Sequence, residues 1–407
     1  MTMSTIRTSY SFLIISLLFI VYGSLFPLSD WRMPDQRFLG IWQQALHSHI
    51  SRSDLLTNLL AYIPVGYFLS SVFSRRIGSI KRIALACCVG LLLSCSLELV
   101  QLFLPARTSS PMDVAFNTFS SVLGALAFNW FGSESVFGVL FGKWRQNHIY
   151  SGAAADTGLL VFFLWGAAQL APFVPSLDFG TVKNGIKPLW QSLHDPSRFN
   201  WYRAITYGLN ISCLGAVQQL IGTYRGRALP WLGLYCGSIF LIKPLIAGRQ
   251  ISLEALVGLA FGVCVSALLR TFPKKNIIAV GWLSVACAFI IEELRPDSLT
   301  LELHSFNWIP FTSQVAENMS GISAILEGIW PFATVGFYAV IHASSGKKIP
   351  AFFYGSLLAG CVFALEYAQT GITGRYPDIT PVVLAGFGWS IPMLVVHKHG
   401  NTNMEHN

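Results

Sequence analysis

The stretch SCSLELVQLFLPARTSSPMDVAFNTFSSVLG, residues 94–124, organises the chain. Two apolar segments meet in it at a short polar turn that contains Arg107. Pro105 and Pro111 flank this arginine and favour a break in the helix, because proline lacks a backbone N–H and restricts the residue before it. The stretch therefore predicts two apolar helices joined by a polar turn.

Four polar side chains flank that turn at helical spacing. Glu98 and Gln101 are three residues apart, and Asp113 and Asn117 are four apart, so each pair shares one helix face. Together with Arg107 these residues form what we call the first elbow. Ionisable groups in or beside hydrocarbon normally face the protein interior and find a partner there. Arg107 is the predicted partner of the two acids.

The first elbow, followed by Gly124, resembles a pattern of the VanZ-like family of bacterial membrane proteins. The upstream segment NLLAYIPVGYFLS, residues 58–70, is similar to that family's asparagine–proline–glycine helix. One departure is Ser110, where the family often has an acid. The resemblance is clearest over residues 54–131, and it implies a polytopic bacterial membrane protein. The best-known relative of that family confers teicoplanin resistance.

Composition predicts an all-α polytopic membrane protein. Hydrophobic residues make up 53% of the chain and charged residues 11%, which is too apolar for one soluble core. A membrane span takes about 20 mostly apolar residues. We predict twelve transmembrane helices, at Tyr10–Phe26, Leu55–Phe73, Ile83–Leu104, Val114–Phe131, Thr157–Val174, Ala204–Ile221, Leu229–Ile246, Ile251–Leu269, Ile277–Ile291, Ile322–Ile341, Ile349–Tyr367 and Ile379–Val396.

The cysteines and the net charge indicate no further site. All eight cysteines fall inside predicted spans and none forms a C-x-x-C pair, so we interpret them as small buried hydrophobes. The formal net charge of +8 comes from basic residues scattered through short loops, where they determine topology. We therefore expect no nucleic-acid partner.

Basic residues also predict the orientation. They gather in alternate short loops, for example at Arg75, Arg76, Lys81 and Arg82. Short loops rich in Lys and Arg stay in the cytoplasm. We therefore expect a multi-pass protein of the bacterial inner membrane with both termini in the cytoplasm. Most acidic residues then lie toward the outer surface, where we expect the polar chemistry.

The predicted spans form three successive units of four. We place the three units and a polar tail at residues 1–145, 146–275, 276–398 and 399–407. Each unit has a long outer loop after its first span, and these loops share short motifs. Phe199–Trp201 and Phe306–Trp308, for example, have the same sequence FNW. Similar motifs at the same place and in the same order favour an internal repeat.

The last third of the chain carries a partial copy of the first elbow. Glu366, Gln369 and Arg375 repeat its spacing of glutamate, glutamine and arginine. Asp378 then stands where the first elbow has Ser110. We call these four residues the third elbow. Proline and alanine occupy the places of the last two polar residues of the first elbow, which favours a structural role for this copy.

The middle third of the chain keeps less of the pattern. Arg249 remains, but Phe240 and Lys243 replace the glutamate and the glutamine. We call these three residues the middle elbow. We interpret its unit as a degenerate copy with a structural role.

Two interpretations of the first elbow stay open. In the structural one, Arg107 pairs with the acids and joins two helices. In the functional one, Arg107 binds a phosphate or carboxylate of a ligand, while the other polar groups bind its sugar or amide groups. The predicted ligand-binding residues are Glu98, Gln101, Arg107, Asp113, Asn117 and Asn58.

No metal, cofactor or catalytic motif is predicted. His47, His194 and His304 occupy matching outer loops, but no two of them have the short spacing of zinc ligands. The sequence contains no nucleophile elbow, phosphate-binding glycine loop or metalloprotease helix. Each histidine is expected to pack in its own loop.

We expect non-enzymatic recognition of an amphiphilic envelope molecule at the outer leaflet. A lipid-linked saccharide, a cell-wall precursor or a glycopeptide-type molecule would fit. Twelve spans with internal repeats would also suit a transporter of an envelope lipid or small polar solute, for which Lys243 and Glu327 are the charges nearest the midplane. An enzyme that modifies a lipid-linked polymer would use Glu98 as its acid or base. The oligomeric state is open.

Overall fold

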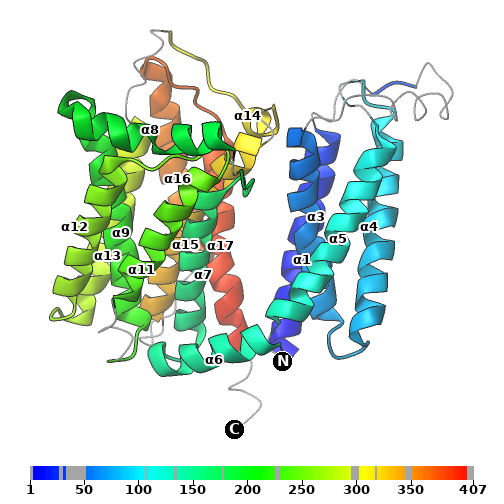
Figure 1. The fold of residues 1–407 in the computed structure, drawn as a ribbon, viewed down its shortest axis with the longest axis horizontal. Helices are drawn as coiled ribbons and strands as arrows, with labels where there is room; N and C mark the ends of the chain where they lie inside the picture. Colours follow the sequence, from blue (N-terminus) through cyan, green and yellow to red (C-terminus); the bar gives the residue numbers. More distant parts are fainter. Residues whose placement is uncertain are drawn as a thin grey trace. The chain divides into compact units, whose positions relative to one another are not determined.

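The computed structural model describes residues 3–26, 31–33, 52–105, 107, 109–132, 135–176, 178–224, 230–294, 302–316, 319–343 and 351–400. Within these ranges the chain is all-helical and contains no strand. It divides into two compact units (Figure 1). Unit 1 holds the described residues of Met1–Trp144 and Thr312–Gly321, and unit 2 holds those of Arg145–Phe311 and Ile322–Gly400.

Unit 1 is built from long helices that run side by side in alternating directions (Figure 1). They are α1 (Met3–Leu25), α3 (Arg52–Val72), α4 (Ser79–Gln101) and α5 (Pro111–Phe131). Helix α3 packs against each of the other three. The core of unit 1 includes the buried side chains Leu13, Ile20, Tyr62, Val65, Leu69, Ala86, Leu97 and Ala125. The short helix α14 (Thr312–Ala316) also belongs to this unit.

Glycine allows α3 and α5 to approach closely. A Cβ atom on Gly124 would lie 2.1 Å from the carbonyl oxygen of Ile63, and one on Gly66 would lie 1.8 Å from that of Ser121. No side chain fits at either position without moving a helix backbone. Small residues at such crossings are typical of helices that pack inside membranes.

Unit 2 contains the remaining long helices. They are α7 (Ala153–Leu170), α8 (Phe179–His194), α9 (Trp201–Ile221), α11 (Trp231–Ile242), α12 (Leu253–Leu269), α13 (Lys274–Leu294), α15 (Met319–Ala343), α16 (Ala351–Ala368) and α17 (Thr380–Gly400). Helix α9 packs against α12 and α13, and α17 packs against α7 and α16. The contact of α9 with α13 joins the second and third predicted repeats in one compact unit. The division into three units stays a prediction.

Five helices in the described ranges are long and apolar enough to cross a membrane. They include Ser79–Gln101, Pro111–Phe131, Ala153–Leu170, Lys274–Leu294 and Gly321–His342. The chain therefore has the apolar helices of a membrane protein. Each of the twelve predicted segments coincides with a helix, and several of these helices are shorter or more polar than the five. Their crossing of the bilayer stays a prediction.

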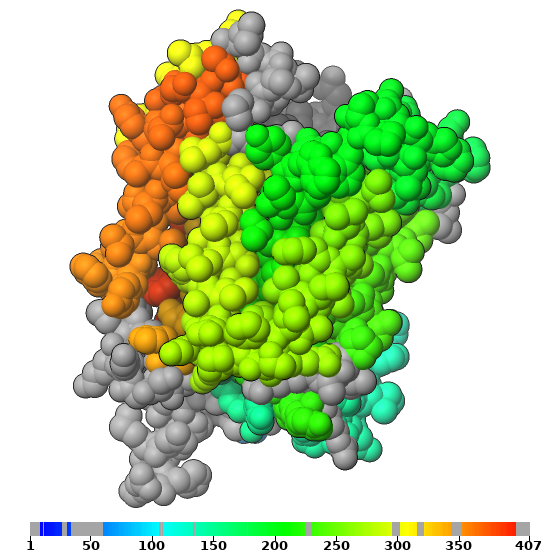
Figure 2. All heavy atoms as spheres, turned by 90° about the vertical axis from the view of Figure 1, so that its left-hand side faces the viewer, coloured from blue at the N-terminus to red at the C-terminus, as the bar shows by residue number. Residues whose placement is uncertain are grey.

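Helix α8 was not predicted, because its segment was assigned to an outer loop. In Figure 1 it lies across the ends of the other helices of unit 2. Figure 2 shows it, in green, above the yellow-green atoms of α12. Phe179, Ile186, Trp190 and Leu193 are exposed along it. Their spacing of 7, 4 and 3 residues puts them on one helix face, and this spacing is the sequence signal of an amphipathic helix here.

One further helix and three short 3-10 turns complete the described fold. Helix α6 (Val136–His148) carries exposed apolar side chains in its first half and ends with basic residues. Arg145 near its end forms an ion pair with Asp156 in the first turn of α7. Three-residue 3-10 turns lie at Pro196–Arg198 (η1), Lys243–Leu245 (η2) and Gln369–Gly371 (η3).

Candidate functional site

Arg107 of the first elbow contacts the end of α1. Its Nε donates to the carbonyl of Phe26 at 2.8 Å, and one terminal nitrogen donates to the carbonyl of Gly23 at 2.6 Å. Gln101 donates from Nε2 to the carbonyl of Ser24 at 2.9 Å. The last carbonyls of a helix have no partner within it, so these side chains satisfy groups that would otherwise be costly to bury.

Glu98 lies in the last turn of α4, with 4% of its surface exposed. Its Oε2 accepts a hydrogen bond from the backbone N–H of Ser110 at 2.7 Å. The Ser110 hydroxyl in turn accepts from the N–H of Met112 and caps α5. Glu98 therefore fixes the beginning of α5 against the end of α4. Asp113 lies in the first turn of α5, where the helix dipole favours an acid.

Asn117 lies deeper between the helices, with 4% of its surface exposed. Its Nδ2 donates to the hydroxyl of Ser94 at 2.9 Å. Its carbonyl oxygen Oδ1 is buried and has no hydrogen-bond partner among the described residues. An unpaired buried amide oxygen is costly, so a donor from outside these residues would stabilise it.

The structure thus brings Glu98, Gln101, Arg107 and Asp113 to the ends of α1, α4 and α5, whereas Asn117 lies further along α5. Two Arg107 hydrogen bonds go to backbone carbonyls, a partner that neither interpretation of the sequence considered. Asn58 lies in α3, and its side chain is outside the described part of the chain.

The third elbow repeats this geometry. Glu366 is 3% exposed, and its Oε2 accepts from the N–H of Asp378 at 3.3 Å. Arg375 donates to the carbonyl of Glu292 in the last turn of α13. Gln369 donates from Nε2 to Glu293 Oε2 at 2.8 Å and to Glu366 Oε1 at 3.0 Å. Glu293 also belongs to this cluster, although the sequence spacing that defines the third elbow did not include it.

Asp378 caps the helix that follows the third elbow. Its Oδ1 accepts from the N–H of Thr380 at 2.6 Å. Burial raises the pKa of the Asp378 carboxyl. Ser110 in unit 1 caps its following helix in the same way, with a hydroxyl that carries no charge.

The middle elbow keeps the arginine contact without the glutamate. Arg249 donates to the carbonyls of Ala171 and Ala168, the second at 3.1 Å, at the end of α7. A terminal nitrogen also forms an ion pair with Glu327 at 2.9 Å. Lys243 is 4% exposed and donates to Gln169 Oε1 at 2.6 Å.

One contact pattern therefore occurs in all three elbows. In each elbow the arginine donates to a backbone carbonyl in the last turn of a helix, and this helix is the first one of the predicted unit. The residue six positions before the arginine in the sequence donates to the residue that directly follows the arginine's acceptor in that helix. The arginine acceptors are Gly23, Ala168 and Glu292, and the residues bound by the second contact are Ser24, Gln169 and Glu293.

Of the two predicted outer-loop histidines that the structure describes, His194 is the last residue of α8 rather than a loop residue, and His304 lies in a loop. His194 stacks on Trp190, with ring centroids 4.0 Å apart, and His304 stacks on Tyr376 at 3.9 Å. His47 is outside the described residues. In the ranges that the structure describes, no group of three or more His, Cys, Asp or Glu side chains could hold a metal ion.

Comparison with known proteins locates a relationship in unit 1. The VanZ/LLP1 family matches residues 8–132, which include the whole first elbow. No curated protein and no solved structure matches the chain. The match confirms the family resemblance for the first third of the chain and does not extend to the third elbow.

Proposed function

Because residues 8–132 match the VanZ/LLP1 family, we propose that this membrane protein recognises an amphiphilic envelope molecule through the first elbow. A lipid-linked saccharide, a cell-wall precursor or a glycopeptide-type molecule has the required polar head and apolar tail. We place the elbow at the outer leaflet of the bacterial cytoplasmic membrane. Unit 1 supplies the binding groups, and unit 2 supplies further spans.

The observation that supports recognition most directly is the unpaired carbonyl oxygen of Asn117. A hydroxyl or amide N–H of a ligand would satisfy it. Glu98 and Asp113 belong to the same elbow, and their carboxylates would accept hydrogen bonds from a ligand. Arg107 contributes a positive charge that favours an anionic phosphate. Gln101 and Arg107 also hold the end of α1 beside the site, while Asn58 stays a proposed contributor.

The same contact pattern in three elbows supports the proposed repeat of three four-helix units. The arginine contacts span 84, 81 and 83 residues in the three cases, so the contact joins segments separated by nearly the same chain length in each unit. Three such units give twelve spans. With an even number of spans both termini lie on one side, and the short basic loops place that side in the cytoplasm.

Cysteine labelling tests the proposed orientation. In a variant without native cysteines, Ser197→Cys should react with an impermeant thiol reagent applied to the extracytoplasmic side. Both Ser197 and Ser79 are exposed, so a cysteine at either position is accessible to the reagent on its own side. Ser79→Cys should react only after the membrane is opened. Labelling of Ser79→Cys in intact spheroplasts would reverse the orientation.

Lipid mass spectrometry tests the proposed recognition. The purified full chain should carry an amphiphile that Asn117→Leu loses while its melting temperature in detergent stays within a few degrees of the original. Asn210→Leu is the matched control, because Asn210 also has a buried carbonyl oxygen without a partner in the described residues, in unit 2. Retention of the amphiphile by Asn117→Leu, or its equal loss from both variants, would contradict the proposal.

A further inference from the structure

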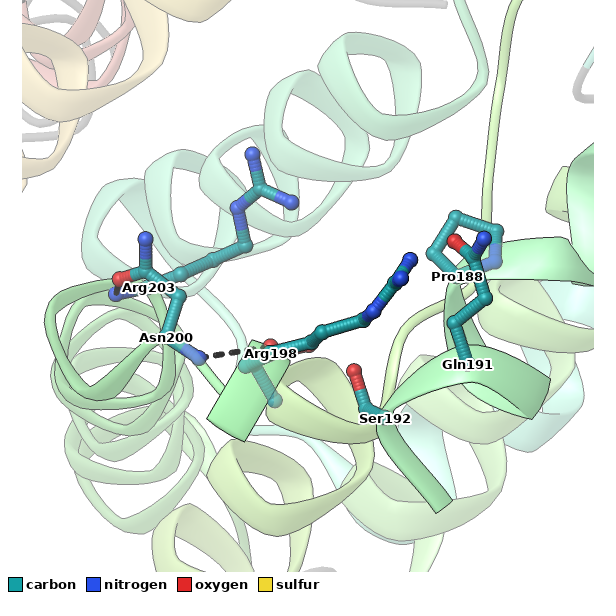
Figure 3. A pocket seen from close by; sticks show the side chains of 7 residues that line it. Pro188, Gln191, Ser192, Arg198, Asn200 and Arg203 are labelled. Carbon is teal, nitrogen blue, oxygen red and sulfur yellow. Dashed lines mark hydrogen bonds between the residues drawn. The ribbon is translucent and has the colours of Figure 1, made fainter. Parts of the chain in front are cut away.

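A pocket lies in unit 2 between α8 and the start of α9 (Figure 3). Its volume is about 180 Å³, and six of the residues that line it are Gln191, Ser192, Arg198, Asn200, Arg203 and Glu254. Figure 3 shows the Arg198 side chain extending from η1 toward Pro188 and Gln191 of α8. The pocket lies within residues 146–275, the predicted middle repeat that we interpret as a degenerate copy with a structural role.

The two arginines offer hydrogen-bond donors to the pocket. The Arg203 side chain has no hydrogen-bond or ion-pair partner among the described residues, and neither do the terminal nitrogens of Arg198. Arg198 Nε binds Asp195 Oδ2 at 3.1 Å, which orients the guanidinium. Hydrogen bonds from Ser197 and Arg198 lower the pKa of the Asp195 carboxyl, so it stays ionised at neutral pH.

An acceptor lies in the same pocket. Glu254 is 3% exposed, and its Oε1 accepts from the N–H of Asn200 at 2.9 Å. Ser192 is also buried, at 6% exposed. The lining therefore combines arginine donors, suited to a phosphate, with a carboxylate that favours a neighbouring ammonium or hydroxyl group.

The helix beside the pocket supplies an apolar surface. Phe179, Trp190 and Leu193 of α8 are 81%, 63% and 57% exposed, on one face of a helix that lies across the ends of its neighbours (Figure 1). An amphipathic helix in this position is typical of the membrane interface, where aromatic side chains lie beside lipid headgroups. A headgroup in the pocket would leave its acyl chains beside this face.

We propose that the pocket binds the headgroup of a membrane phospholipid, with its phosphate on Arg198 and Arg203 and an ammonium or hydroxyl group directed to Glu254. The ligand class is a glycerophospholipid whose headgroup contains a hydrogen-bond donor, as phosphoethanolamine does. This site is separate from the first elbow and does not depend on the function proposed there.

Titration calorimetry on the full chain in detergent tests this site, with dihexanoyl phosphatidylethanolamine as the probe. Arg203→Gln should weaken binding about tenfold or more, since a charge-assisted contact to phosphate is lost. Lys183→Gln is the matched control, because it removes an exposed cation from α8 outside the pocket lining. Dihexanoylglycerol, which lacks the phosphate, should not bind, and inorganic phosphate should bind more weakly than the lipid.

Several results would overturn the proposal. Equal affinities of Arg203→Gln and Lys183→Gln would exclude the arginine contact, and binding of dihexanoylglycerol as tight as that of the phospholipid would exclude phosphate recognition. Inorganic phosphate binding as tightly as the lipid would make this a site for free phosphate. Arg198→Gln provides a second variant if Arg203→Gln fails to fold. Asn117→Leu should keep full affinity for the probe, which separates this site from the first elbow.

Discussion

The first elbow and the middle elbow share one arginine contact in different surroundings. Arg107 and Arg249 both donate to carbonyl oxygens at the end of the first helix of their predicted units. The first elbow also contains the buried carboxylate of Glu98, whereas the middle elbow has Phe240 in the corresponding place and the buried Lys243 in place of the glutamine. The shared contact satisfies the backbone, and the side chains that differ are those that could bind a ligand.

This difference separates two roles within one motif. A contact that closes a helix end is needed in every unit, because the last carbonyls of each first helix need a partner. Polar side chains beyond it are not needed for that purpose, since the middle elbow binds the end of α7 with Phe240 in the place of the glutamate. Asp113 and Asn117, which neither of the other elbows repeats, are therefore the residues of the first elbow whose presence favours the proposed recognition.

The largest effect is expected from removing the shared arginine. Arg107→Ala and Arg249→Ala should each lower the free energy of unfolding by about 2–4 kcal/mol, because hydrogen bonds from a charged group to buried carbonyls are lost. Melting in detergent, followed by intrinsic fluorescence, measures the change. Arg76→Ala, an exposed arginine in a short loop, is the control. If Arg107→Ala melted like the original protein, the contact would not stabilise the fold.

The next effect concerns the glutamates that only the first and third elbows contain. Glu98→Ala and Glu366→Ala should each cost about 1–3 kcal/mol, because the N–H of Ser110 or Asp378 loses its acceptor. Glu98→Gln keeps an acceptor oxygen and should cost less. The same melting assay reports the difference. Equal melting temperatures for Glu98→Ala and Glu98→Gln would show that this hydrogen bond is dispensable.

A smaller contrast is expected at the residue six positions before the arginine. Gln101→Met should cost about 1 kcal/mol, since its hydrogen bond to the Ser24 carbonyl is lost. Lys243→Met should be neutral or stabilising, because replacing a buried charge by an apolar side chain of similar length removes a desolvation cost. Denaturation in detergent compares the two variants. Marked destabilisation by Lys243→Met would give that ammonium a structural role of its own.

The smallest effect concerns Asp378 and pH. Burial raises the pKa of this carboxyl, so the folded protein binds its proton more readily than the unfolded chain does. The associated stabilisation is present at low pH and is lost as the pH rises through the folded-state pKa. Asp378→Asn, which can still cap the helix, should therefore melt slightly higher than the original at pH 8, with a difference that narrows toward pH 4. A difference independent of pH would contradict this account.

Local sequence pattern determined the positions of the helices. Runs of apolar residues and the prolines around Arg107 predicted helices that the structure contains, because hydropathy and proline act within a few residues. The pattern also located the first elbow and its family. It missed α8 because half of that helix is polar, and a search for long apolar runs does not detect an amphipathic helix.

Only the tertiary structure decided the partners of the polar residues. Arg107 binds carbonyls 81 and 84 residues away, and a backbone carbonyl has no residue type by which a sequence could identify it. The pocket beside α8 likewise joins Ser192 and Arg203 with Glu254, which lies in α12. Sequence by itself determined which segments are apolar and helical and where the polar residues lie among them. The packing of those helices decided which polar groups face each other, because that depends on contacts between segments far apart in the chain.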